Sequence, residues 1–157
     1  MARWHEVLSD APEFAIAVQA VFDAHKHKVL ATLRRDGAPR VSGNEARFLD
    51  GEVYLGMMLD SVKARDLLRD PRLALHSATF DPEMRLGDAK IAGRGVEVPD
   101  GDEQARYLAV QGDPGGAFHL FRIDIDEVVL TRIGTPADHL LIESWHPGRG
   151  LQRVRRV

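Results

Sequence analysis

The chain contains no cysteine. This absence excludes a disulfide framework, a thiolate metal site and a cysteine nucleophile, and it favours a reducing compartment. Long apolar runs are also missing: no stretch approaches the ~20 apolar residues of a membrane span. Near the N-terminus, Glu6, Asp10 and Glu13 interrupt any signal-peptide core. We therefore expect a cytoplasmic protein that is neither exported nor inserted into a membrane.

An excess of positive charge is lacking as well, because the formal net charge is -3. This balance argues against nucleic acid as the main partner. The last residues are locally basic, with Arg149, Arg153, Arg155 and Arg156, and we expect them to form a solvated end. With 44% hydrophobic and 29% charged residues, the 157-residue chain has the ordinary composition of a globular protein, and we predict a single domain over residues 1–157.

Two common catalytic arrangements have little support. No Gly-x-Ser-x-Gly elbow is present, which argues against a serine hydrolase of that class. The seven histidines are scattered along the chain, whereas a zinc ion needs three or four convergent ligands. We therefore expect neither a hydrolytic triad nor a metal site.

The clearest helical pattern runs from about Ala11 to Ala24. Asp10 is the expected N-cap, Pro12 falls in the first turn and Glu13 takes the capping-box position. One face of this helix is apolar, as expected for a helix that packs on a core. The residues of that face are Phe14, Ala17, Val18, Val21 and Phe22.

From Val29 onward the pattern changes to that of strands. Three β-rich runs, 29–33, 40–48 and 53–58, are separated by Asp-Gly turns, which predicts an antiparallel meander. Further strands are expected at 73–79, 88–98, 121–130 and 140–145, and short helices at 61–68 and 101–110. Gly93 and Gly95 indicate a bend or bulge, and the change of phase after Glu127 indicates a long strand that bends. A closed or nearly closed barrel of six or seven antiparallel strands accommodates these elements.

The most informative segment is Ser61-Val62-Lys63-Ala64-Arg65, where a strand leads into a helix. Ser61 is the expected N-cap, so Lys63 and Arg65 fall in the first helical turn. Cations there oppose the helix dipole at about 0.3–1 kcal/mol each. A bound phosphate would reverse this cost, because free backbone N–H groups and cations would both contact it. The alternative is that Ser61 only caps and the long side chains extend into solvent.

Five short motifs, in this order, resemble the pyridoxamine 5'-phosphate oxidase-like FMN-binding split-barrel superfamily. The likeness is strongest to its small members that use FMN or the deazaflavin coenzyme F420. It covers residues 28–98 well and the last third loosely. The motifs lie at Ala31–Ser42, Asp50–Leu55, Ser61–Leu67, Asp70–Leu75 and Ala89–Gly93.

This resemblance implies a mainly β fold, namely an antiparallel split β-barrel with an N-terminal helix and short inserted helices. It also implies a homodimer with two equivalent cofactor sites at its interface. The phosphate of the cofactor would be held by Ser61 and Lys63, with Arg65 or Arg40 as further cations. The flavin would be lined by Arg40, Val41 and Ser42 from one strand and by Met57 and Met58 from another.

The chain also departs from the family pattern. Val62 stands where the pyridoxamine phosphate oxidases have an arginine, and Thr131 aligns with their late tryptophan. The residues that grip the substrate phosphate in those enzymes have no counterpart between Val98 and Phe121. We therefore expect an FMN-dependent oxidoreductase acting on a small organic substrate other than pyridoxamine phosphate. The alternatives are a deazaflavin-dependent reductase and a non-catalytic cofactor-binding or sensing protein.

Four further residues keep more than one interpretation. Trp145 either covers the cofactor or plugs the end of the barrel. His76, Ser77 and Thr79 lie on the strand that passes the flavin edge in this superfamily. Alternation alone does not decide whether their side chains face the ring, the core or solvent.

Overall fold

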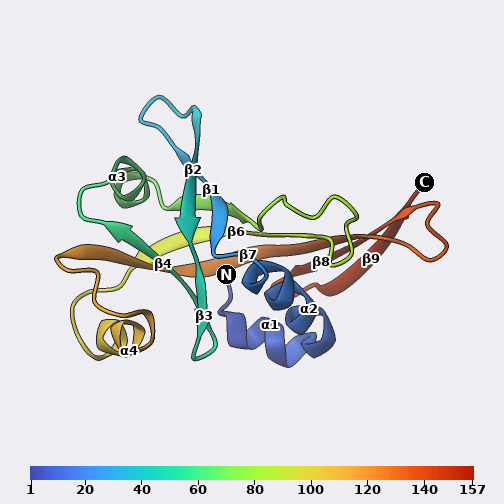
Figure 1. Ribbon diagram of the computed structural model, residues 1–157, viewed down its shortest axis with the longest axis horizontal. Coiled ribbons are helices and arrows are strands. Elements are labelled where there is room, and N and C mark those ends of the chain that lie inside the picture. Colours follow the sequence, from blue (N-terminus) through green and yellow to red (C-terminus); the bar gives the residue numbers. More distant parts are fainter.

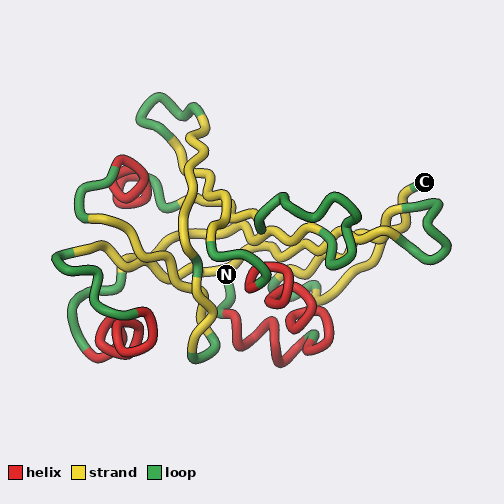
Figure 2. Tube along the Cα trace, in the orientation of Figure 1, coloured by secondary structure: helices red, strands yellow, loops and turns green.

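Nine antiparallel strands in one sheet, with four helices against it, make up the computed structural model, which describes residues 1–157 (Figures 1 and 2). The helices are α1 (Trp4–Asp10), α2 (Pro12–Asp23), α3 (Val62–Arg69) and α4 (Asp102–Gln111). The strands are β1 (His27–Leu33), β2 (Pro39–Glu45), β3 (Arg47–Leu49), β4 (Glu52–Met58), β5 (Arg72–His76), β6 (Asp88–Glu97), β7 (Phe118–Ile133), β8 (Leu140–His146) and β9 (Gly150–Arg156). The predicted mainly β class is confirmed, although there are nine strands and not six or seven.

The sheet is open between its two edge strands. Its main order is β2-β1-β5-β6-β7-β4-β3, so β2 and β3 are the two edges of this path. The prediction of one run over 40–48 is wrong, because the chain leaves one edge after Glu45 and joins the other at Arg47. The simple meander fails for the same reason: β2 pairs with β1 alone, and β3 pairs with β4.

Strand β7 holds the two parts of the sheet together. Along one side it pairs with β6, and along the other it pairs first with β4 and then with β8. The register with β6 shifts between Ala92 and Gly93, which confirms the predicted bulge. Gly93 is required there, because an added Cβ would lie 2.1 Å from the backbone oxygen of Asp124. The long bending strand expected around Glu127 is therefore also confirmed.

Two helices, not one, precede the sheet. The predicted helix at 11–24 is confirmed as α2, and its apolar face is buried. The prediction of Asp10 as its N-cap is wrong, since Asp10 is the last residue of α1. Its carboxylate instead accepts a hydrogen bond from the Trp145 indole at 2.7 Å, which connects α1 to β8. None of the four helices is long and apolar enough to span a bilayer.

The basic end of the chain forms a strand. The four arginines are exposed, as expected for a solvated end, but the segment is not irregular, because β9 pairs with β8 over its whole length. Arg153 contacts Glu143 at 2.8 Å, and Arg155 contacts Asp138 at 3.2 Å. The resulting ribbon extends away from the helices, and the C-terminus lies at the far end of the molecule from α3 and α4 (Figures 1 and 2).

Candidate cofactor-binding cleft

A cleft of about 570 Å³ lies where β4 ends and α3 begins. Its other walls come from the end of β2, from α4 and from the loop after α4. Figure 1 shows α3 and α4 at the same end of the sheet, with β4 running between them. The volume falls within the range of about 300–1,000 Å³ that small-molecule sites occupy.

Ser61 lies at the N-cap position of α3, as predicted, but its side chain makes no capping hydrogen bond. Its hydroxyl oxygen is buried and has no hydrogen-bond partner in the protein, although the residue lines the cleft. The first N–H groups of a helix have no partner within the helix. Hydrogen-bonding groups for an anion are therefore present together at this point of the wall.

Lys63, in the first turn of α3, also lines the cleft. Its ammonium group donates a hydrogen bond to the backbone oxygen of Gly43 at 2.6 Å and forms no ion pair. Burial lowers the pKa of Lys63, because the charged form loses hydration that no carboxylate replaces. An anion in the cleft would stabilise this charge.

Of the eight residues assigned to the site by resemblance, the structure brings four together at the cleft: Met57, Met58, Ser61 and Lys63. The Met57 side chain is buried in the core, whereas Met58 is 80% exposed. The other four, Arg40, Val41, Ser42 and Arg65, do not line the cleft. Val41 and Arg65 are exposed, and the Ser42 hydroxyl is buried without a partner.

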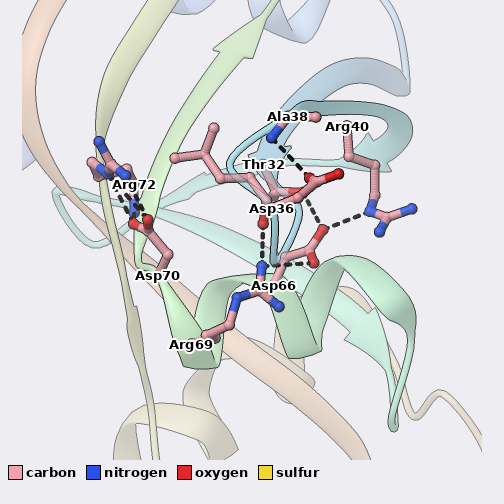
Figure 3. A network of polar contacts seen from close by, with 9 residues as sticks. Thr32, Asp36, Ala38, Arg40, Asp66, Arg69, Asp70 and Arg72 are labelled. Carbon is pink, nitrogen blue, oxygen red and sulfur yellow. Dashed lines mark hydrogen bonds and ion pairs between the residues drawn. The ribbon is translucent and has the colours of Figure 1, made fainter.

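Arg40 is directed toward α3, where its Nε lies 2.6 Å from the Asp66 carboxylate (Figure 3). Asp66 is buried and also accepts hydrogen bonds from Thr32 at 2.9 Å and from Arg69 at 3.1 Å. Burial raises the pKa of Asp66, but the hydrogen bonds from these three residues outweigh it and hold the pKa below its ordinary value. The network connects α3, and with it Ser61 and Lys63, to β1 and β2.

The wall formed by α4 was not found from the sequence. Tyr107, Leu108 and Gln111 line the cleft, together with most of the loop after α4 and Phe118 at the start of β7. The Tyr107 hydroxyl lies so close to Gly56 that an added Cβ there would be 2.6 Å from it. The run Gly112-Asp-Pro-Gly-Gly116 was the available signal, because such loops bring backbone close to a ligand.

The four residues whose roles the sequence left open lie away from the cleft: His76, Ser77, Thr79 and Trp145. Trp145 is buried in the core. This position agrees with a side chain that fills the end of the barrel and not with one that covers the cofactor. The Ser77 hydroxyl is buried and accepts a hydrogen bond from the Ala89 N–H at 3.1 Å. His76 contacts the Ser77 backbone oxygen, and Thr79 is exposed.

Most of the chain matches the profile of a known protein family. A profile described as pyridoxamine 5'-phosphate oxidase matches residues 14–132. The chain belongs to the pyridoxamine 5'-phosphate oxidase-like family. The predicted resemblance is thereby confirmed. No curated protein matches the chain significantly.

Several solved structures share the fold. A pyridoxamine 5'-phosphate oxidase-related, FMN binding protein from Nostoc punctiforme is 16% identical, with a TM-score of 0.66 over 94% of this chain and 96% of that one. PhzG from Burkholderia lata, in complex with tetrahydrophenazine-1-carboxylic acid, is 14% identical, with a TM-score of 0.64 over 99% and 92%. An F420 reductase is 17% identical, with a TM-score of 0.52 over 68% and 91%. The predicted split-barrel fold is therefore confirmed.

Proposed function

We propose that the cleft binds FMN and that the protein is an FMN-dependent oxidoreductase acting on a small organic substrate other than pyridoxamine phosphate. One observation supports this most directly. The buried Ser61 hydroxyl has no partner, and the Lys63 ammonium has no carboxylate, yet both line the same cleft at the start of α3. A phosphate group satisfies both, together with the first N–H groups of the helix.

The chain contributes binding and orientation. Lys63 and Ser61 hold the phosphate, while Met57, Met58 and the α4 wall offer apolar and backbone surface beside the ring. A bound flavin supplies the hydride chemistry, so no side chain of the cleft has to act as an acid or a base. Val62 in place of a cation argues against the vitamin B6 reaction.

The deazaflavin coenzyme F420 is the second candidate cofactor. It is favoured by Val62, because the loss of one cation weakens the hold on a simple phosphate monoester. An F420 reductase also shares the fold. The structural support is stronger for FMN, since Ser61 and Lys63 alone suffice to contact one terminal phosphate.

The test is a pair of calorimetric titrations of the apoprotein, one with FMN and one with coenzyme F420. We expect Lys63→Ala to weaken FMN binding about 10- to 100-fold, since a hydrogen bond to a charged group contributes roughly 1.5–3 kcal/mol. Lys90→Ala is the matched control, because Lys90 is exposed on β6 outside the cleft. If wild type binds neither cofactor, the proposal is wrong. If it binds FMN but no donor reduces the complex with turnover, the protein is a cofactor-binding or sensing member.

We further propose a homodimer that covers the open side of the cleft. Several large apolar side chains around β2 and the start of α3 are exposed in the single chain, and a partner would bury them: Val41, Met58, Leu59 and Val62. Sedimentation equilibrium tests this. A Met58→Asp, Val62→Asp double variant should be monomeric and bind FMN more weakly, whereas a monomeric wild type would exclude the shared interface.

A further inference from the structure

A second cavity, of about 540 Å³, lies next to the cofactor cleft. The two share three wall residues, Glu45, Tyr107 and Gln111. Gln111 accepts a hydrogen bond from Arg47 at 2.6 Å and donates one to Glu45 at 3.1 Å, so this chain of contacts separates the two spaces. The remaining wall comes from the end of α2, from β1 and from the junction of β2 with β3.

Positive charge predominates on the wall of this cavity. Three cations, Lys26, Lys28 and Arg47, face two carboxylates, Asp23 and Glu45. Lys26 pairs with Glu45 at 3.2 Å. Lys28 and Arg47, by contrast, form no ion pair with any carboxylate.

Lys28 is the more unusual of the two, because it is only 5% exposed. Its ammonium donates hydrogen bonds to the backbone oxygens of His25 at 2.5 Å and Lys26 at 3.0 Å, which leaves one proton without a partner. Burial lowers the pKa of Lys28 and outweighs the opposing negative charges of Asp23 and Glu45, while the positive charge of Arg47 adds a smaller lowering effect. A buried ammonium with no carboxylate in direct contact is costly, and an anion in the cavity would offset that cost.

Arg47 presents the matching geometry. Its Nε is occupied by Gln111, which fixes the plane of the guanidinium. Both terminal nitrogens make no hydrogen bond within the chain, and two such donors suit the paired oxygens of a carboxylate or phosphate.

We propose that this second cavity binds an oxyanion, the carboxylate or phosphate group of a small organic molecule, through Lys28 and Arg47. The shared wall places such a molecule beside the cofactor cleft, which assigns it as the substrate. That second step rests on the proposed function, whereas the anion site itself does not.

Calorimetric titration with benzoate, phenyl phosphate and the neutral benzyl alcohol tests the site, in the absence and presence of FMN. We expect saturable binding of at least one of the two anions and no binding of the alcohol. The anion that binds more tightly shows whether the cavity prefers a carboxylate or a phosphate group. Arg47→Gln removes the charge but keeps an amide donor for Gln111, and it should raise the dissociation constant at least tenfold. Arg94→Gln, at an exposed position on β6, should change it less than twofold.

Equal binding by Arg47→Gln, equal binding of the alcohol, or no saturable anion binding would each overturn the proposal. Lys28→Met gives a second variant, whose fold is checked by circular dichroism before titration. If Lys28→Met does not fold, the comparison of Arg47→Gln with Arg94→Gln still tests whether the cavity binds an anion. Retained anion binding by a protein that does not bind FMN would refute the substrate assignment and the proposed function while leaving the anion site established.

Discussion

Arg40 and Asp66 form an ion pair across the open side of the barrel, with 2.6 Å between the Arg40 Nε and the Asp66 carboxylate (Figure 3). Arg40 comes from β2 and Asp66 from α3, so the pair fixes the helix against an edge strand that otherwise pairs only with β1. Lys63 is one helical turn before Asp66 and spans the same gap to Gly43. The ion pair therefore positions the phosphate-binding end of the helix without lining the cleft.

Replacing Asp66 should destabilise the fold. Asp66→Asn removes the charge that Arg40 and Arg69 contact while keeping the side-chain shape. We expect a loss of about 3 kcal/mol in the free energy of unfolding, as for the breaking of a buried ion pair. Urea denaturation measures this. Asp126→Asn, at an exposed position in β7, is the control, and an equal effect of both variants would contradict a specific role for the network.

The same carboxylate should make stability depend on pH. The pKa of Asp66 is lower in the folded protein, despite the opposing effect of burial, because the hydrogen bonds from Arg40, Thr32 and Arg69 outweigh it. The folded state therefore binds this proton less readily than the unfolded chain. The stabilisation is complete above the unfolded pKa of about 3.9 and is lost as the pH falls through the lower folded value.

Urea denaturation of wild type and Asp66→Asn between neutral and acid pH isolates this contribution. The difference in stability between the two proteins should shrink as the pH falls. A difference that stays constant would show that Asp66 does not change its protonation on unfolding in the expected sense.

The bulge between β6 and β7 predicts a strong effect of one methyl group. Gly93→Ala would place a Cβ 2.1 Å from the Asp124 backbone oxygen, and backbone cannot move aside as a flexible side chain can. We expect a loss of about 1–3 kcal/mol or more, as for overpacking. Gly43→Ala, in strand β2 with open space around the added atom, is the matched control for stability. Thermal denaturation compares them, and similar midpoints would refute the argument.

Gly56 and Tyr107 should be energetically coupled. Gly56→Ala brings a Cβ to within 2.6 Å of the Tyr107 hydroxyl, which must then shift. Tyr107→Phe removes that oxygen and should relieve most of the cost. A double-mutant cycle in urea should give a coupling of about 0.5–1 kcal/mol or more, and strictly additive effects would show that the two residues do not meet.

Local patterns in the sequence predicted most of the secondary structure. Helix α2 and the helix after Ser61 follow from proline positions and apolar periodicity, and the bulge follows from Gly93. Two elements were missed for physical reasons. Helix α1 is short and its pattern blends with that of α2, while β9 has exposed, mostly polar residues and owes its conformation to pairing with β8.

The candidate site was only half predictable. Ser61 and Lys63 were found because one short helix start contains both the hydroxyl and the cation. Arg40 was expected beside the flavin, but its side chain pairs with Asp66, a tertiary contact that strand alternation does not indicate. The wall from Tyr107 and Gln111 was missed because a short amphipathic helix gives no sign of which ligand its partly buried face adjoins.

Strand β7 pairs with three other strands along its 16 residues. This pairing determines which parts of the molecule unfold together. Because partners lie along both sides of β7, we expect its amides to exchange with deuterium mainly through global unfolding. The β8–β9 ribbon and α4 have fewer partners and can exchange through local opening. Opening of α4 would remove the wall common to both cavities, so access to the two spaces would follow the same local motion.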